Sequence, residues 1–240
     1  MTGDRFATLT FQRKVAAPVA TLYHAWTAPA ARAVWSSPGQ GVTVEILHSD
    51  ARIGGEELSV CRAEGTPEVT VQARWLALQP NERTVGTEVV SSQGAVDGVA
   101  LVTAGFTAEG DGSRIDVTVQ LSSLANDMAP GYQFGYGGGL DNLAQVAERT
   151  MLISRVIQAP VAAVWGAWTD PESLPRWWGP DGFSCKTSKI DLRAGGEWVF
   201  DMIGPDGTVF PNHHRYGQVI PGARLDYALL AGENGPKHAD

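Results

Sequence analysis

The sequence contains an internal repeat, and this feature constrains the fold more than any other. Residues 11–27 (FQRKVAAPVATLYHAWT) and 153–169 (ISRVIQAPVAAVWGAWT) align at an offset of 142, with 8 identities in 17 positions. Chance would give about one identity at roughly 6% per position. The identical pairs are Arg13/Arg155, Ala17/Ala159, Pro18/Pro160, Val19/Val161, Ala20/Ala162, Ala25/Ala167, Trp26/Trp168 and Thr27/Thr169. We therefore predict a tandem duplication.

The alignment continues with a slip of one residue, after which Gly-Gly-Glu at 54–56 matches Gly-Gly-Glu at 195–197. Other matching pairs are Pro29/Pro171, Trp35/Trp177, Arg74/Arg215, Trp75/Tyr216, Pro80/Pro221 and Arg83/Arg224. At this offset Asp240 corresponds to Val99, so residues 100–149 have no counterpart. We predict a complete domain over 1–149 and a second domain over 150–240 that lacks the last two strands and the C-terminal helix.

The first unit is predicted to contain a strand, two short helices, six strands and a long helix. Pro18 suits the first turn of a helix, and Pro29 separates that helix from a second one reaching Trp35. Turn residues separate the six later strands, which are expected near 42–49, 55–62, 68–79, 83–91, 99–108 and 113–122.

The closing helix of this unit is the element expected to cover the sheet. Leu140, Leu143, Ala144 and Ala147 share one helical stripe. An antiparallel meander buries one face, and no other predicted element is long enough to cover that face. We therefore predict an α+β fold in which a curved sheet wraps around this helix, with a ligand cavity in any space left between them.

The second unit repeats only the beginning of this pattern. We predict a strand over 150–158, helices over 161–168 and 171–177, and strands near 183–190, 196–203, 210–220 and 224–231. Without a covering helix, Phe183, Trp198 and Phe200 would expose apolar surface, which monomers rarely tolerate over several hundred Å². We hypothesise that the cover comes from a second copy in a homodimer, from another partner chain, from the first unit, or from further residues.

Three segments of the second unit carry a family resemblance. They are RVIQAPVAAVWGAWTDPESLPRWWGPDGF (155–183), DLRAGGEWVFDM (191–202) and GPDGTVFPNHHRYGQVIPGARLDY (204–227). This pattern resembles the START-like helix-grip superfamily (SRPBCC, related to the birch-pollen allergen), and within it the branch of the activator of the 90-kDa heat-shock protein ATPase. The first unit keeps the order of elements but departs from the signature, with Ala28-Pro29-Ala30 in place of Asp170-Pro171-Glu172.

The resemblance implies a helix-grip fold with a mostly apolar pocket. Members of the superfamily bind lipids, polyketides or other hydrophobic small molecules, act as cyclases or self-resistance proteins, or bind the heat-shock ATPase. No catalytic apparatus is common to them, so the resemblance transfers no catalytic residue to this chain.

Charge and composition exclude several classes of partner. A net charge of −8 with only 18 Lys and Arg argues against binding to nucleic acid or to an anionic membrane. The sequence contains no run of about 18 apolar residues, so it predicts no membrane span. Cys61 and Cys185 are too few and too far apart for a disulfide framework, which predicts reduced, buried thiols in a cytoplasmic protein.

Aromatic residues are the first candidates for contact with a ligand. Trp26, Trp35, Trp168 and Trp177 lie in the short helices, where a structural role competes with ligand binding. Gly135 and Gly137–Gly139, at the entry of the terminal helix, predict a flexible lid or an opening. The residues expected at the mouth of the cavity and on the facing helix stripe are Tyr132, Phe134, Tyr136 and Leu140.

Polar residues that recur in both repeats are the second group of candidates. Glu56 with Arg74, next to Trp75, could form a salt bridge inside the cavity, and Arg215 repeats Arg74; surface positions are the competing interpretation. His213 could contribute acid–base chemistry, although His213 and His214 face opposite sides of a strand and cannot chelate one ion. We predict no metal, no cofactor and no catalytic residue.

These observations favour binding of a hydrophobic small molecule in the cavity of the first unit without catalysis. One alternative is a co-chaperone-like module that activates a heat-shock ATPase. A second alternative is a polyketide cyclase or hydrolase that uses Tyr132, Tyr136 or a pocket histidine as acid or base.

Overall fold

The computed structural model describes residues 5–39, 41–124, 127–153 and 155–230. The chain divides into two units, residues 1–153 and residues 154–240. Each unit has its own hydrophobic core.

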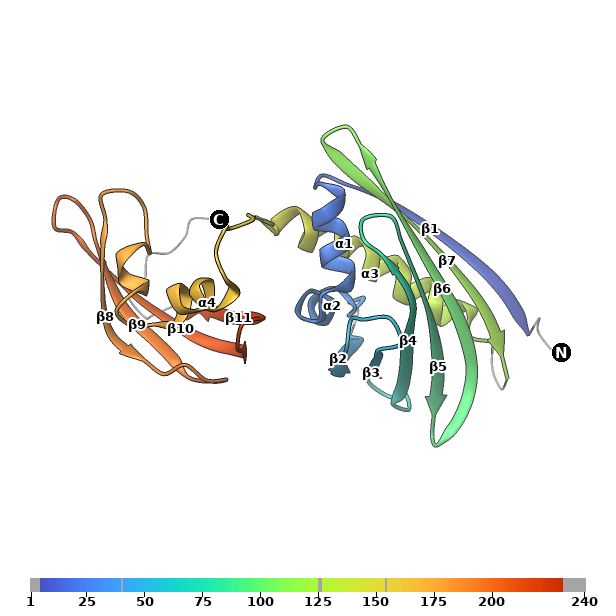
Figure 1. Ribbon diagram of the computed structural model, residues 1–240. Helices are drawn as coiled ribbons and strands as arrows, with labels where there is room; N and C mark the ends of the chain where they lie inside the picture. The colour runs from blue at the N-terminus through green and yellow to red at the C-terminus, as the bar shows by residue number, and fades with distance from the viewer. Residues whose placement is uncertain (1–4, 40, 125–126, 154, 231–240) are drawn as a thin grey trace. The chain divides into compact units, whose positions relative to one another are not determined.

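Unit 1 contains a seven-stranded antiparallel sheet, two short helices and one long helix (Figure 1). The strand order β1-β7-β6-β5-β4-β3-β2 places the first strand beside the last. The predicted helix-grip fold is confirmed. In chain order the elements are β1 (Phe6–Val15), α1 (Val19–Thr27), α2 (Pro29–Trp35), β2 (Thr43–Ser49), β3 (Glu56–Arg62), β4 (Val69–Gln79), β5 (Arg83–Ser92), β6 (Ala95–Glu109), β7 (Gly112–Ser123) and α3 (Ala129–Arg149).

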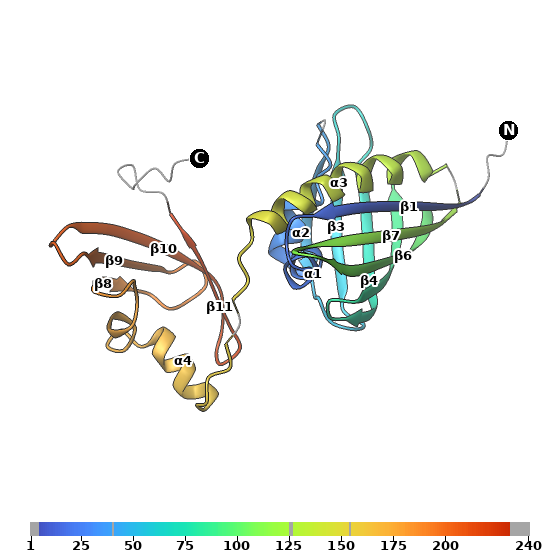
Figure 2. The same cartoon turned by 90° about the horizontal axis from the view of Figure 1, so that it is seen from above.

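Helix α3 lies inside the curve of this sheet (Figure 2). Of its predicted stripe, Leu140, Leu143 and Ala147 are fully buried and Ala144 is partly buried, in agreement with the helical spacing. On β7, Ile115 and Val117 are buried while the residues between and beside them are more exposed, which is the two-residue period of a half-buried strand. The core therefore lies between the concave face of the sheet and α3.

Helices α1 and α2 close one end of the core with two stacked indoles. The rings of Trp26 and Trp35 lie 5.1 Å apart at 14°. Trp26 Nε1 donates to Thr84 Oγ1 at 3.0 Å, and Trp35 Nε1 donates to the Ala25 carbonyl at 2.9 Å. Because both N–H groups are paired, these tryptophans can be buried without an unsatisfied donor.

The repeated Gly-Gly pair has a backbone explanation. Gly54 has φ +79°, and a Cβ on Gly55 would lie 2.2 Å from the Asp50 carbonyl oxygen. In unit 2, Gly195 has φ +76°, and the corresponding Cβ on Gly196 would lie 2.0 Å from a carbonyl oxygen. Only glycine fits at these positions, so the motif forms the tight turn before a strand.

The glycines of α3 lie within a continuous helix, and not at its entry as the sequence predicted. A Cβ on Gly138 would lie 2.5 Å from the carbonyl oxygen of Pro38, which follows α2. Asn142 Nδ2 donates to the Ser37 carbonyl at 2.7 Å in the same region. The absence of a side chain at Gly138 thus permits close packing of α3 against this loop.

Unit 2 contains α4 (Val161–Thr169), a 3-10 helix η1 (Leu174–Arg176) and a four-stranded antiparallel sheet. The strands are β8 (Ser184–Ile190), β9 (Glu197–Ile203), β10 (Val209–Ile220) and β11 (Arg224–Leu229). Their order, β11-β10-β9-β8, repeats the order β5-β4-β3-β2 of unit 1. Residue 231, the end of the last predicted strand, lies outside the described residues.

The predicted strand over 150–158 is wrong. Residues 151–153 and 155–158 form no strand. The corresponding strand of unit 1, β1, is held by antiparallel pairing with β7. Within residues 155–230 no strand corresponds to β7, so a β-branched, apolar sequence in unit 2 has no partner for its backbone.

The predicted exposure of Trp198 and Phe200 is also wrong, since both side chains are buried. The ring of Trp178 lies 4.9 Å from that of Trp198, and Leu174 and Met202 complete the same cluster. By contrast, α4 buries none of its residues. The apolar surface of unit 2 therefore lies at other residues, including Val161, Trp177, Val209 and Phe210.

Two findings concern the predictions from composition. Among the described residues, no helix is long and apolar enough to cross a membrane. Cys61 and Cys185 are both free thiols, and each is partly rather than fully buried.

Candidate functional site

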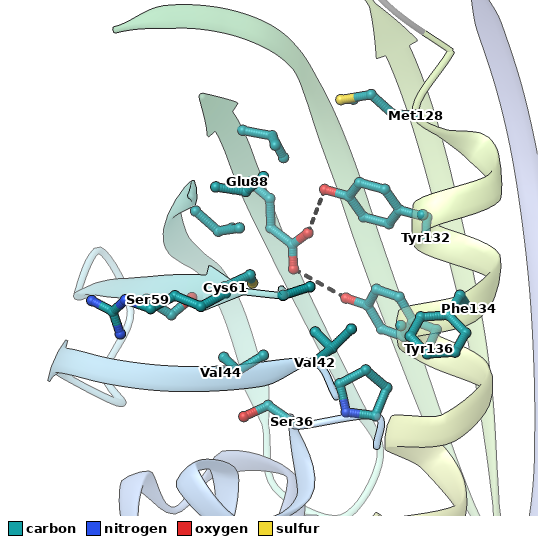
Figure 3. A pocket seen from close by; sticks show the side chains of 18 of the residues that line it. Ser36, Val42, Val44, Ser59, Cys61, Glu88, Met128, Tyr132, Phe134 and Tyr136 are labelled. Atoms are coloured by element: carbon teal, nitrogen blue, oxygen red, sulfur yellow. Dashed lines mark hydrogen bonds between the residues drawn. The ribbon is translucent and has the colours of Figure 1, made fainter. Parts of the chain in front are cut away.

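A cavity of about 540 Å³ lies in unit 1 between the N-terminal half of α3, the end of α2 and the inner face of β2–β5 (Figure 3). Its volume is in the range of about 300–1,000 Å³ that is typical of small-molecule sites. The lining is mostly apolar and includes Trp35, Pro38, Val42, Val44, Ile46, Val69, Val71, Ala73, Val90, Met128 and Phe134.

Strand alternation explains which side chains reach the cavity. On β3, Glu57, Ser59 and Cys61 line it, whereas Glu56 and Leu58 do not. On β5 the lining residues are Glu88, Val90 and Ser92. Side chains two residues apart share one face of a strand, so each strand contributes a row to the cavity wall.

A carboxylate and two tyrosines form a polar group in this wall (Figure 3). Tyr132 Oη donates to Glu88 Oε2 at 2.7 Å, and Tyr136 Oη donates to Glu88 Oε1 at 3.0 Å. The tyrosines are four residues apart on α3, so they lie on one helix face, with their rings 6.0 Å apart at 13°. In the sheet, Glu88 is paired with Ala73 and Ala100.

The environment of this group favours its neutral form. Burial raises the pKa of Glu88, and the tyrosine hydrogen bonds and the charge of Arg32 oppose the shift without cancelling it. Burial and the nearby Glu88 charge raise the pKa of Tyr132 and, to well above its ordinary value, that of Tyr136. Burial and Glu88 also raise the pKa of the Cys61 thiol. Perturbed groups of this kind in a cavity are typical of functional sites.

A buried ion pair forms a second polar group. Arg32 Nε and Nη2 donate to Glu57 Oε2 and Oε1, each at 2.7 Å. Ser49 Oγ donates to Glu57 Oε2 at 2.8 Å, and Arg32 Nη1 donates to the Trp26 carbonyl at 3.1 Å. Burial alone raises the pKa of Glu57, but the charge and hydrogen bonds of Arg32, with the Ser49 hydroxyl, outweigh burial and lower it.

The guanidinium of this pair is also enclosed by aromatic rings. The Arg32 Cζ atom lies 5.8, 5.1 and 5.3 Å from the ring centroids of Trp26, Trp35 and Trp75, respectively. Cation–π attraction at these distances adds to the bidentate contact with Glu57. Arg32 is thus held from several sides.

The polar groups belong to unit 1 alone. The alignment of the repeats places Leu174 at the position of Arg32, Trp198 at that of Glu57 and Ile190 at that of Ser49. It places Leu229 at the position of Glu88, and the antiparallel pairing of both residues agrees with this alignment. Unit 2 therefore has apolar side chains where unit 1 has two carboxylates, a guanidinium and a hydroxyl.

The structure brings four of the predicted site residues to the cavity, namely Trp35, Tyr132, Phe134 and Tyr136. Trp26, Trp75 and Leu140 lie instead in the core of unit 1, because their side chains pack between α1, the sheet and α3. Trp26 and Trp75 line a separate space of about 30 Å³.

The predicted salt bridge of Glu56 and Arg74 inside the cavity is wrong. Glu56 Oε1 lies 3.6 Å from Arg74 Nη2, but both side chains are more than half exposed. The two residues are paired across β3 and β4 and therefore share one face of the sheet. That face is the outer one, since Glu57 faces inward.

The candidates in unit 2 are not residues of this cavity. His213 and Arg215 lie 3.3 and 3.5 Å from Glu197 Oε1 in a surface charge cluster. The neighbouring His214 faces the aromatic core, with its ring 5.0 Å from that of Tyr227, as strand alternation requires.

Trp168 and Trp177 form an edge-to-face pair with ring centroids 4.6 Å apart. Trp177 Nε1 donates to the Ala167 carbonyl at 2.8 Å, which repeats the Trp35–Ala25 bond of unit 1. The contacts observed for these two side chains are packing contacts within unit 2.

Arg32, Glu57 and Glu88 were missed by the sequence reasoning. Two signals could have indicated them. Glu57 follows Glu56 on a strand, so one of the two carboxylates must face inward. The repeat alignment also identifies charged positions of unit 1 that are apolar in unit 2.

Residues 5–39, 41–124, 127–153 and 155–230 contain no group of three or more His, Cys, Asp or Glu side chains placed to hold a metal ion.

Comparisons with known proteins agree with this fold. The family model described as "Activator of Hsp90 ATPase homolog 1-like protein" matches residues 16–148 and 158–239. Among solved structures, a protein from Rhizobium loti is 29% identical with a TM-score of 0.53 and covers 59% of this chain and 96% of its own. A Rhizobium leguminosarum protein is 28% identical, with a TM-score of 0.53 and coverages of 60% and 96%.

A third structure, from Chromobacterium violaceum, is 25% identical with a TM-score of 0.50 and covers 60% of this chain and 99% of its own. A search of curated proteins finds no significant match.

Proposed function

The chain belongs to the family of Activator of Hsp90 ATPase homolog 1-like proteins, and on that premise we propose that unit 1 binds an apolar small molecule in the cavity between its sheet and α3. The observation that carries this proposal is the cavity of about 540 Å³ with a mostly apolar wall. A ligand that fills an apolar space of this size gains about 25 cal/mol of favourable binding free energy for each Å² of apolar surface that is removed from water.

Binding without catalysis is the function that the lining supports best. Tyr132 and Tyr136 both use their hydroxyl groups to donate hydrogen bonds to Glu88. The pKa of the Cys61 thiol is raised, so this side chain is a poor nucleophile near neutral pH. A polyketide-type cyclase activity would instead require turnover that is lost on Tyr132→Phe or Tyr136→Phe substitution.

Native mass spectrometry of freshly purified protein tests the proposal. We expect a mass in excess of the polypeptide, which denaturation releases. Val71→Phe should abolish the excess mass because Val71 lines the cavity. Val99→Phe makes the same change at a residue that is 42% exposed, and it should keep the ligand. Equal loss in both variants, or retention in both, would place the ligand elsewhere.

Membership of the family of Activator of Hsp90 ATPase homolog 1-like proteins supports a second candidate, a module that acts on a heat-shock ATPase. This function needs an outer surface and not the cavity. A pull-down of the 90-kDa heat-shock protein, with ATPase turnover measured with and without the chain, tests it. Val71→Phe should leave that interaction unchanged.

A further inference from the structure

The cavity of unit 1 contains a carboxylate that has no cationic partner among the described residues. Glu88 accepts hydrogen bonds from the neutral hydroxyls of Tyr132 and Tyr136 and forms none of the observed ion pairs. An ionised carboxylate has about four lone-pair positions, and two are occupied here. Glu88 also lines the cavity, so the remaining positions are available to a bound molecule.

Arg32 cannot serve as that partner because its charge is already neutralised. Two of its nitrogens donate to Glu57, and the third donates to the Trp26 carbonyl. Both side chains of the pair are nearly buried, with 12% and 5% of their surface exposed. The pair therefore adds no net charge to the cavity, and it leaves the charge that Glu88 carries when ionised uncompensated.

Two further carboxylates, Asp97 and Asp127, line the cavity. Besides Arg32, the cationic side chain in the described lining is Arg62, which is bound to Glu45 at 2.6 Å and to Glu68 at 2.8 Å. The lining thus attracts a cation and repels an anion.

We propose that the preferred ligand is an apolar molecule that carries a cationic amine, with the ammonium group donating to Glu88 and the apolar body lying against the rows of β2–β5 and Phe134. This inference rests on the proposed binding function and specifies its ligand class. A fatty acid or another carboxylate would bring a second negative charge toward Glu88 and is disfavoured.

Binding of such a ligand is linked to protonation. The charged or titratable groups near Glu88 are Arg32 from α2, Glu57 and Cys61 from β3, and Tyr132 and Tyr136 from α3. Between pH 5 and pH 8, Arg32 stays protonated and Glu57, with its lowered pKa, stays ionised. The tyrosines and Cys61 have raised pKa values and stay protonated. Burial raises the pKa of Glu88 toward neutral pH, so amine affinity should rise as pH rises through that pKa and the carboxylate ionises.

Calorimetric titration of the whole chain with octylamine, octan-1-ol and octanoate, below their micellar concentrations, tests the inference. We expect octylamine to bind most tightly, octan-1-ol less tightly and octanoate most weakly. Glu88→Gln should weaken octylamine roughly 10- to 100-fold, the range of a charge-assisted hydrogen bond. It should also remove the dependence on pH and change octanol binding by less than about threefold. The control is Glu82→Gln, the same change at an exposed residue.

The possible outcomes separate the two proposals. Octylamine that binds no tighter than octanol, or that is insensitive to Glu88→Gln, overturns the amine inference and leaves the apolar site. Failure of all three probes to bind overturns the apolar site as well. Unchanged octanol binding by Glu88→Gln shows that the variant is folded.

Discussion

Substitution of Arg32 by methionine should strongly destabilise unit 1. The change leaves the Glu57 carboxylate, whose side chain is 5% exposed, without its cation. Removing one partner of a buried ion pair costs about 3–5 kcal/mol, because the remaining charge is desolvated and uncompensated. Loss of the Arg32 Nη1 bond to the Trp26 carbonyl acts in the same direction.

The dependence on pH distinguishes this mechanism from a simple loss of packing. In the wild type the pKa of Glu57 is lowered, so its contribution is present above the ordinary carboxyl pKa and is lost as pH falls through the lowered value. In Arg32→Met the charge and hydrogen bonds of Arg32 are lost, so burial, opposed by the Ser49 hydroxyl, raises the pKa of Glu57. The variant should therefore gain stability as pH falls from neutral toward the ordinary carboxyl pKa, and its deficit should shrink.

Native-state hydrogen exchange of the β3 amides, read by mass spectrometry between pH 5 and 8, measures unit 1 separately from unit 2. The control is Arg52→Met, since the Arg52–Asp50 pair at 2.6 Å is exposed and should contribute at most about 1 kcal/mol. An Arg32→Met deficit below about 1 kcal/mol, or one independent of pH, would refute the reasoning.

The double variant Arg32→Met, Glu57→Leu completes the test. Replacing both members of a buried pair by apolar residues is often neutral or stabilising. In unit 2 the positions that align with Arg32 and Glu57 are already occupied by two buried apolar residues, Leu174 and Trp198. We expect the double variant to recover most of the stability that the single variant loses.

Three further predictions concern other parts of the chain. Glu88→Gln should stabilise ligand-free unit 1 at pH values above the raised pKa of Glu88, by about 1.4 kcal/mol for each pH unit by which that pKa is raised. This gain in the free energy of unfolding should vanish as pH falls to the ordinary carboxyl pKa. Urea titration at several pH values measures it. Gly138→Ala should lower the free energy of unfolding by about 1–3 kcal/mol, because the new Cβ would lie 2.5 Å from a carbonyl oxygen. Gly137→Ala, whose Cβ would have nothing within 4 Å, should raise that free energy by about 0.5–1 kcal/mol. Thermal unfolding of the two variants compares them. Association of unit 2 with a second copy or another chain stays a prediction, and static light scattering of the purified chain giving a monomer mass at all concentrations would exclude the homodimer.

The amino-acid sequence alone determined the duplication, the order of elements in unit 1 and the burial of the α3 stripe. These features are local, because helical and strand periodicity and turn residues act over a few positions. The sequence also indicated Tyr132, Phe134 and Tyr136 as cavity residues, since they lie on a helix whose covering role followed from its length.

Tertiary structure decided the rest. Alternation shows that Glu56 and Glu57 face opposite sides of β3, but only packing of the sheet on α2 and α3 assigns Glu57 to the interior. Glu88 and Tyr132 are 44 residues apart in the sequence, so the hydrogen bond between their side chains depends on the register of the sheet. Residues 151–153 and 155–158 carry strand-like sequence, yet without a counterpart of β7 they form no strand, because a β-strand is stabilised by its neighbours and not by its own residues.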